Sequence, residues 1–159
     1  LKEGPLDQHF GSEIMQDICF GVDEISQYIH FNDRFYTRNL ITRTDDFELL
    51  ALCWKSEQKT PVHDHNGAKG WIKVLQGQIE ETRYKQDLSP KNKCLKLHSQ
   101  EKVSSGDISY IEDEIGLHSL ANVSSKNCIT LHLYSPSVVY CNDYDQKTSQ
   151  AKKHVLVYQ

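Results

Sequence analysis

The spacing of apolar residues divides the chain into a helical first part and a longer part built of short strands. Between residues 12 and 31, apolar residues recur every three or four positions, the spacing of one face of an α-helix: Ile14, Met15, Ile18, Val22, Ile25, Tyr28 and Ile29. Gly21 interrupts this series, because glycine is a poor residue for a helix interior. The pattern therefore predicts two short helices within residues 1–35.

After Asn39 the apolar residues fall in short runs typical of strands. The runs cover residues 48–54, 71–75, 79–84, 94–98, 108–111, 128–134 and 155–158. Turn-forming residues separate them, as at 66–67, 89–92 and 104–107. Many short strands at this spacing predict a sandwich or barrel of antiparallel strands with the helices packed on one side.

The length of the chain fits one domain. A chain of 159 residues can bury a sizeable core without disulfides or metal ions to hold it together. We see no internal repeat, no low-complexity segment and no linker long enough to divide it. We therefore expect residues 1–159 to form a single domain, with residues 1–35 packed on the strands.

The charge and the cysteines narrow the class of protein. The 22 acidic and 18 basic residues are well mixed, which argues against binding to nucleic acid or to an acidic membrane surface. Five widely spread cysteines without a C-x-x-C pair indicate reduced thiols. Since there is also no apolar run long enough to span a membrane and nothing that resembles a signal peptide, we expect a cytoplasmic protein with a small-molecule partner.

A pair of histidines offers the clearest candidate chemistry. His63 and His65 stand two residues apart, so on an extended strand their imidazoles point the same way and can share a transition metal. His118 is the best-placed third ligand, because Gly116 allows a tight turn just before it. The alternative is that each is an ordinary surface or core histidine, as we expect for four of the other five: His9, His30, His98 and His154.

These residues resemble the two motifs of the cupin superfamily. The similarity runs through His63, His65 and Gly77 in the first motif and Gly116, His118 and Asn122 in the second. It implies a mostly β fold, a cupin-type antiparallel β-barrel of jelly-roll type, with short N-terminal helices. The chain departs from the motifs at three positions: Glu57 replaces the opening glycine, Asp113 lies near the usual proline, and Gly70 replaces the glutamate.

The missing glutamate changes the chemistry that the site would favour. Three neutral imidazoles leave a divalent metal its full positive charge and, for octahedral iron, three open positions on one side. Such a site suits an anionic, chelating substrate together with dioxygen. A structural zinc ion would instead need a fourth protein ligand, which the sequence does not show.

Within the cupins, the chain resembles the cysteine dioxygenase family. The matching segments lie in order at residues 36–40, 53–54, 63–65, 75–77, 115–118 and 131–136. The resemblance implies a mononuclear non-haem Fe(II), held by His63, His65 and His118, at which both atoms of O2 are added to the thiol of L-cysteine. The product is then cysteine sulfinic acid.

The same resemblance assigns residues to the substrate. Arg38 alone is a surface charge, but in the family the matching arginine binds the carboxylate of the amino acid and the residue matching Tyr36 helps to hold it. A guanidinium suits this role because it can engage both carboxylate oxygens. Relatives that act on 3-mercaptopropionate typically have glutamine at this position.

Residues 128–134 add a row of three polar side chains. Thr130, His132 and Tyr134 share one face of this predicted strand, which taken alone would be its solvent face. The resemblance instead implies that His132 and Tyr134 are catalytic and line the pocket, with His132 hydrogen-bonded to the Tyr134 hydroxyl, and that Thr130 and Tyr134 contact substrate.

Mammalian members carry a cysteine that forms a thioether with this tyrosine. Gly70 stands at that position, which implies an uncrosslinked Tyr134.

The expected partners are L-cysteine and O2, with no nucleic acid, no membrane and a monomeric protein. Three alternatives stay open: a dioxygenase of another small thiol such as 3-mercaptopropionate or cysteamine, a metal-dependent cupin isomerase, and a non-enzymatic metal-binding cupin.

Overall fold

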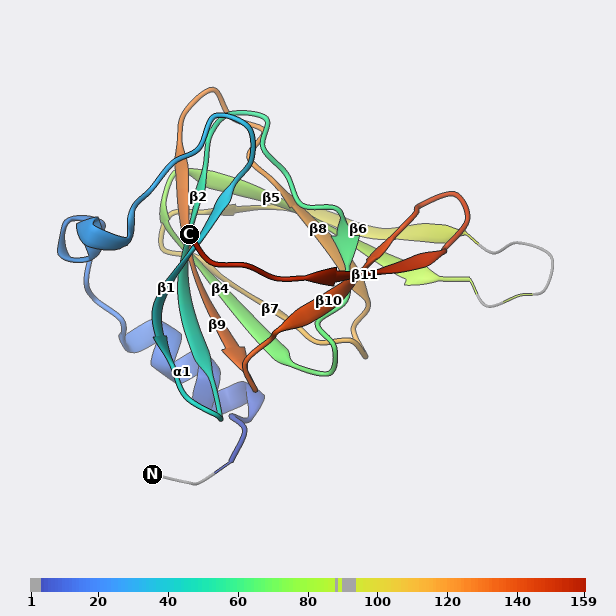
Figure 1. Cartoon of the computed structure of the whole chain (residues 1–159), viewed down its shortest axis with the longest axis horizontal. Coiled ribbons are helices and arrows are strands. Elements are labelled where there is room, and N and C mark those ends of the chain that lie inside the picture. Colours follow the sequence, from blue (N-terminus) through green and yellow to red (C-terminus); the bar gives the residue numbers. More distant parts are fainter. Residues whose placement is uncertain (1–3, 88, 90–93) are drawn as a thin grey trace.

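Two antiparallel sheets face each other in a computed structural model that describes residues 4–87, 89 and 94–159 (Figure 1). The first sheet, in the order β1-β2-β9-β4-β7, contains β1 (Thr37–Arg43), β2 (Glu48–Trp54), β9 (Cys128–Ser135), β4 (Lys69–Gln76) and β7 (Ile108–Ile111). The second, in the order β11-β10-β3-β8-β5-β6, contains β11 (Ala151–Val155), β10 (Tyr140–Tyr144), β3 (Val62–His63), β8 (Leu117–Ala121), β5 (Gln78–Gln86) and β6 (Leu95–Ser104). The chain is therefore mostly β, as predicted.

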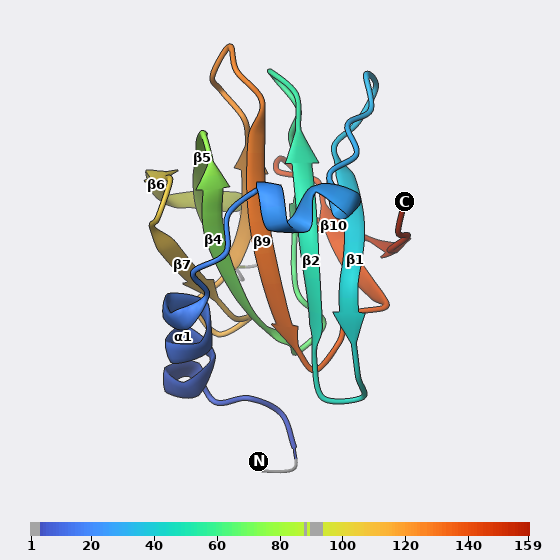
Figure 2. The ribbon, with the colours of Figure 1, turned by 90° about the vertical axis from the view of Figure 1, so that its left-hand side faces the viewer.

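The N-terminal segment covers the outer face of the first sheet. It contains the α-helix α1 (Gln8–Asp17) and the 3-10 helix η1 (Asp23–Tyr28), with Gly21 between them as predicted. Figure 2 shows α1 beside β4 and β7, and η1 crossing in front of β9 and β2. The Lys73 ammonium donates to the carbonyls of Met15 and Ile18, 2.8 and 2.7 Å away, and so satisfies acceptors at the end of α1.

Strand β9 is buried on both faces because it lies between two apolar layers. Leu131 and Leu133 pack with Met15 and Trp71 under the N-terminal segment. The opposite face of β9 looks toward the space between the sheets, where Leu50, Ile72 and other residues form the second apolar cluster. Every residue of β9 is buried, so the row of Thr130, His132 and Tyr134 does not face solvent.

The strands that apolar runs did not predict are short or mixed in character. Strand β3 has two residues, and β8 and β10 alternate too weakly to stand out. Arg38 lies inside β1 and not before the first strand, and the last strand is β11 and not residues 155–158. Leu156 and Tyr158 nevertheless pack against the inner cluster, which accounts for their apolar spacing. Most of the predicted turn at 89–92 falls outside the described residues.

Two further features bear on the class of protein. All five cysteines are free: Cys19, Cys53, Cys94, Cys128 and Cys141. Within the described part of the chain, no helix has the length and apolar character needed to cross a membrane.

Candidate metal centre and substrate pocket

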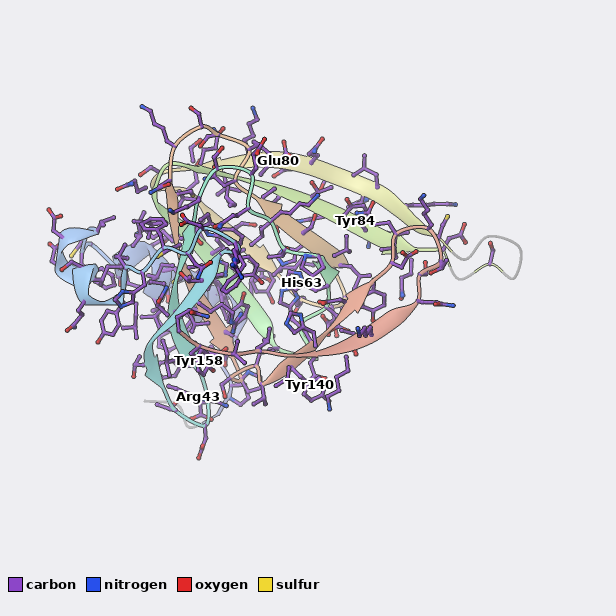
Figure 3. All side chains as sticks on the ribbon, turned by 45° about the horizontal axis from the view of Figure 1, so that its top comes forward. Arg43, His63, Glu80, Tyr84, Tyr140 and Tyr158 are labelled. Atoms are coloured by element: carbon purple, nitrogen blue, oxygen red, sulfur yellow. The ribbon has the colours of Figure 1, made fainter. Side chains whose placement is uncertain are left out.

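The three predicted histidines come together between the sheets. His63 ends β3 and pairs across the sheet with His118 of β8, and His65 follows His63 in the chain. The Nε2 atom of His118 lies 3.1 Å from Nε2 of His65 and 3.2 Å from Nε2 of His63. Figure 3 shows His63 well inside the outline of the molecule, away from Arg43 and Glu80 at its periphery. His65 lies beyond the end of β3, but the two side chains converge as predicted.

Hydrogen bonds place a proton on the far nitrogen of two of these rings. Nδ1 of His63 is 2.9 Å from the carbonyl of Pro61, and Nδ1 of His118 is 2.7 Å from Oε1 of Glu81. Both oxygens are acceptors, so each ring donates through Nδ1. Burial lowers the pKa of His118 to about 4 and that of His63 well below its ordinary value. Both rings are thus neutral, with a bare lone pair on Nε2.

Glu81 anchors His118 from β5. Its carboxylate also accepts a hydrogen bond from Ser109 Oγ at 2.5 Å and one from Arg83 Nη2 at 3.1 Å. Burial alone would raise the pKa of Glu81, but the hydrogen bond from His118 and the neighbouring donors outweigh it and lower the pKa to about 2. A buried, ionised carboxylate behind an imidazole is the usual support of a metal-bound histidine.

Asp113 positions the loop that carries His65. It accepts hydrogen bonds from the backbone amides of His65 at 2.8 Å and Gly67 at 2.7 Å. Its Oδ1 also lies 3.7 Å from His65 Nδ1, which is longer than a hydrogen bond. The Nδ1 atom of His65 has no hydrogen-bond partner. The Nε2 atoms of all three rings nevertheless lie together.

This arrangement fits a metal ion. Three lone pairs about 3 Å apart repel one another unless a cation lies between them, and metal–nitrogen bonds of about 2.1 Å at right angles give that separation. The ligand atoms of the three histidines all lie within 4.8 Å of one another, and in the described part of the chain no fourth histidine, cysteine or carboxylate joins the group. The donor set therefore suits a catalytic metal with an open side better than a structural zinc ion.

Gly116 is needed for this geometry. It has a φ of 142°, and a Cβ atom there would lie 2.5 Å from the carbonyl oxygen of Tyr84. The predicted turn before His118 is thus present, and a larger residue would push β8 away from β5.

The histidines open onto a pocket between the sheets. Its lining includes Tyr36, Arg38, His63, His65, His132, Tyr134, Cys141, Asp143, His154 and Leu156. All the predicted site residues except His118 and Thr130 therefore line it directly. His118 lies directly behind, with its Nε2 atom beside those of the other two histidines.

Arg38 brings a buried positive charge to this pocket. Its side chain is 10% exposed, and Nη2 lies 3.6 Å from Oε1 of the buried Glu48. Nε and Nη2 are buried and have no hydrogen-bond partner. Buried donors are rarely left unpaired in folded proteins, so this guanidinium is suited to an anionic ligand. Tyr36, beside it, is stacked on Trp54 with ring centroids 4.5 Å apart.

A chain of hydrogen bonds runs along the inner face of β9. Trp54 Nε1 is 2.9 Å from Thr130 Oγ1, Thr130 Oγ1 is 2.8 Å from His132 Nε2, and His132 Nδ1 is 2.9 Å from the Tyr134 hydroxyl. Thr130 was predicted to contact substrate, but its hydroxyl lies behind His132 and is engaged by the indole. Because the indole can only donate, the Thr130 hydroxyl is left to donate to His132 Nε2.

This order sets the donor-to-acceptor direction of every hydrogen bond in the series from Trp54 to Tyr134. Burial, and next to it the charge of Arg38, lowers the pKa of His132 well below its ordinary value, so the ring is neutral and has one N–H. With Nε2 accepting, that N–H is Nδ1–H, which donates to the Tyr134 oxygen. Burial raises the pKa of Tyr134, so its hydroxyl keeps its proton and is free to donate into the pocket.

Gly70 lies directly against the Tyr134 ring. The two residues pair across β4 and β9, and a Cβ atom at Gly70 would lie 3.0 Å from Cε1 of Tyr134. The position at which the resemblance implied a missing crosslinking residue is thus directly beside the Tyr134 ring, and it has no side chain.

Sequence reasoning missed the residues that hold the site from behind. Glu81 and Glu48 were predicted only as parts of strands, and Trp54 also within a matching segment, each without a role. A signal was available for Glu81, which shares an inward face with Ile79 and is therefore a carboxylate at a core position. The partner of Trp54 comes from β9, 76 residues away in the sequence, whereas Glu48 meets Arg38 across the β1–β2 hairpin.

Comparison with known proteins agrees with these features. The model of the family "Cysteine dioxygenase type I" matches residues 6–147. Cysteine dioxygenase type 1 of Rattus norvegicus is 34% identical over 137 residues, which cover 85% of this chain and 68% of that protein. The human protein of the same name is 33% identical over 137 residues, which again cover 85% of this chain and 68% of that protein.

Solved structures support the fold. A double-stranded β-helix protein from Klebsiella pneumoniae has a TM-score of 0.58 at 16% identity, and the match covers 87% of this chain and 91% of that one. A cupin protein from Desulfovibrio desulfuricans has a TM-score of 0.54 at 20% identity, covering 69% and 91%. The predicted cupin-type architecture is confirmed at the level of two antiparallel sheets.

Proposed function

The chain belongs to the cysteine dioxygenase type I family, and from this premise and the geometry of the pocket we propose that it converts L-cysteine and O2 to cysteine sulfinic acid. The observation that carries the proposal is the pairing of two features in one pocket. Three imidazoles present bare nitrogens to a common point, and a buried guanidinium with unpaired donors lies on the same pocket wall.

We propose that His63, His65 and His118 hold one Fe(II) ion. When bound, iron supplies the redox chemistry that joins dioxygen to a thiol, and the protein supplies binding and orientation. Glu81, Asp113 and the Pro61 carbonyl keep the three rings in place. Fixed imidazoles present the same open side to every substrate molecule.

Arg38 is proposed to bind the carboxylate of L-cysteine. Its Nε and Nη2 donors can engage both oxygens of one carboxylate, which orients the substrate as well as attracting it. Tyr36 lies in the same wall and is proposed to assist. Holding the thiol at a fixed place beside the metal makes its reaction with dioxygen an intramolecular one.

Tyr134 is proposed to donate its hydroxyl proton as a hydrogen bond toward the bound substrate or oxygen. The chain from Trp54 through Thr130 and His132 supports this role, because it leaves the Tyr134 hydrogen free. Thr130 then acts by positioning His132 and does not touch the substrate. With Gly70 beside it, Tyr134 is proposed to work without a thioether crosslink.

The related activity on cysteamine is disfavoured by Arg38, since cysteamine has no carboxylate to pair with the guanidinium. An experiment separates the two substrates. In the Arg38→Gln variant we expect the KM for L-cysteine to rise about 10- to 100-fold, because a charge-assisted pair contributes about 1.5–3 kcal/mol. Oxygen uptake with cysteamine should change little. Steady-state rates on both substrates measure this.

Arg38→Lys is the matched control, because it keeps the positive charge but cannot bind both carboxylate oxygens with two parallel donors. It should recover part of the affinity for L-cysteine. If Arg38→Gln uses L-cysteine as well as the unaltered protein while its thermal unfolding is unchanged, the carboxylate does not bind Arg38. Equal losses on both thiols would likewise contradict the assignment. A metal-dependent isomerase or a non-enzymatic metal-binding cupin would consume no oxygen with either thiol.

A further inference from the structure

A second group of metal-ligating side chains lies on the hairpin of β10 and β11. Cys141 and Asp143 are two residues apart in β10, so they share a face, and His154 of β11 pairs directly with Cys141 across the hairpin. Oδ2 of Asp143 is 2.8 Å from Nδ1 of His154, and its Oδ1 is 3.9 Å from Sγ of Cys141. The three ligand atoms all lie within 4.8 Å of one another.

We propose that Cys141, Asp143 and His154 form a second divalent-metal site, distinct from the three-histidine centre and selective for a thiol-binding ion such as Zn²⁺. A thiolate, an imidazole and a carboxylate together are a common zinc donor set, and three protein ligands leave one tetrahedral position open. The thiolate also distinguishes this site from the first, which has nitrogen donors only.

The distances need little adjustment to accept an ion. Zinc bonds of about 2.0–2.3 Å in a tetrahedron place neighbouring ligand atoms about 3.3–3.7 Å apart. The sulfur is 3.9 Å from Oδ1 of Asp143, close to that separation. The imidazole is 2.8 Å from Oδ2 and needs to move away by about half an ångström on the same estimate, and the sulfur and the imidazole nitrogen lie within 4.8 Å of each other. His154 and Asp143 can make this movement because their side chains are 42% and 28% exposed.

The contacts of the three side chains leave them available. The polar contact of the Cys141 thiol is the long one to Asp143, and the polar contact of the His154 ring is with the same residue. The neighbouring Asp64 is occupied elsewhere, since it accepts hydrogen bonds from Asn142 and Tyr144. Lys153, next to His154, lies over the Tyr140 ring at 3.9 Å and does not enter the group.

The acidic residues around Cys141 favour a bound cation and disfavour a thiolate with no ion beside it. Burial, together with Asp143 and Asp64, raises the pKa of Cys141 to about 12, so the thiol is protonated when no ion is bound. The same acidic surroundings attract a cation, and direct ligation removes the thiol proton. The proton that Nδ1 of His154 donates to Asp143 moves to Nε2 when Nδ1 binds the ion. Binding therefore releases the thiol proton, without any change in oxidation state.

The location of the group gives it a consequence for turnover, which rests on the proposed function. Cys141, Asp143 and His154 line the same pocket as Arg38 and His63. An ion held there would take up space and add charge beside the position proposed for the substrate. Zinc should therefore inhibit oxygen uptake through this site.

Anaerobic titration of the full chain with Co²⁺, a spectroscopic substitute for zinc, tests the site without any need for turnover. We expect a near-ultraviolet thiolate-to-cobalt charge-transfer band, with two cobalt ions bound per chain at saturation, one at each centre, and one in a variant that lacks the first centre. The band should disappear in Cys141→Ser and persist in His63→Ala, which disrupts only the first centre. Cys19→Ser is the matched control, because that thiol is exposed and far from the hairpin in sequence, and it should leave the band unchanged.

The proposal is overturned if the unaltered chain shows no such band at saturating Co²⁺, or if the band survives in Cys141→Ser. Near-ultraviolet circular dichroism of the variants checks that each is folded. In a second measurement on iron-loaded protein, Zn²⁺ should inhibit the unaltered chain more strongly than Cys141→Ser. Equal inhibition of both would refute the effect on turnover. If iron-loaded protein consumes no oxygen at all, the proposed function fails, while the cobalt titration still decides whether the site exists.

Discussion

At the scale of single residues, hydrogen-bond partners behind His63, His118 and His132 set where the protons of these rings lie. The Pro61 carbonyl and Glu81 fix the protons of His63 and His118, and Trp54 fixes the direction of the chain that ends at Tyr134. These supporting groups determine where lone pairs and protons point. The residues behind the pocket therefore determine how precisely the side chains that face it are oriented.

Thr130 offers the sharpest test of this view. Thr130→Val keeps the shape but removes the hydroxyl, so Trp54 loses its acceptor and His132 is free to adopt the other tautomer. We expect the free energy of unfolding to fall by about 1–3 kcal/mol from the unpaired indole N–H. We also expect kcat to fall about tenfold with little change in KM, since a hydrogen-bond donor for the reacting groups contributes at least that much.

Thr130→Ser is the control, because it retains both hydrogen bonds and should keep kcat near that of the unaltered protein. A valine variant that is less stable but turns over at the normal rate would show that the chain is only structural.

The absence of a crosslink at Tyr134 can be measured directly. A thioether forms with loss of two hydrogens, and Gly70 provides no sulfur for it. We expect the intact mass of the reduced chain to stay at the value given by its sequence after repeated turnover with iron, cysteine and oxygen. Peptide mass spectrometry checks the segment that contains Tyr134. A modified Tyr134 joined to any of the five cysteines would contradict the prediction.

The candidate metal ligands, Arg38 and the row on β9 were predictable because paired or periodic positions and a family resemblance marked them. The supporting residues were not, since hydrogen-bond partners such as Trp54 and Thr130 lie 76 residues apart in sequence. Only the register of the strands brings them together.

At the scale of elements, β9 shows how the site is stiffened. It lies between the N-terminal layer and the inner cluster, so its apolar residues fix one face while its polar residues form the other. Its pattern was read correctly from period two, but burial of both faces depends on a helix that the strand pattern does not show. The short strands β3 and β8 are not marked by apolar runs for a related reason: β3 is held by pairing with β8 and β10, and β8 by pairing with β3 and β5, whatever their composition.

The turn after β2 contains a residue in an unfavourable conformation. Glu57 stands where the cupin motif has glycine, and it has a φ of 68°, the left-handed region that suits glycine. Its backbone amide donates to the Asn122 carbonyl at 2.8 Å, a bond that glycine would keep. We therefore expect Glu57→Gly to raise the free energy of unfolding by about 0.5–1 kcal/mol, the strain relieved less the added freedom of the unfolded chain.

Chemical denaturation of the two proteins measures this difference. Glu57→Ala is the control, because it removes the carboxylate but keeps the Cβ atom and should give no comparable gain. A glycine variant less stable than the alanine variant would mean that the left-handed conformation costs little here.

At the scale of the whole molecule, the fold class, the grouping of the three histidines and the family were accessible from the sequence, because each rests on local spacing or on ordered motifs. The pairing order of the two sheets was not, since it depends on contacts between distant strands. The single domain, the monomeric state and the cytoplasmic location stay predictions.

The central claim is that one pocket binds iron through three imidazoles and L-cysteine through Arg38. An oxygen electrode with anaerobically iron-loaded protein tests it most directly, with the product identified by mass spectrometry. We predict oxygen uptake on addition of L-cysteine, one O2 consumed for each cysteine sulfinic acid formed, and loss of that uptake in His118→Ala. Iron-loaded, folded protein that consumes no oxygen with L-cysteine, or that yields only cystine, would contradict the account.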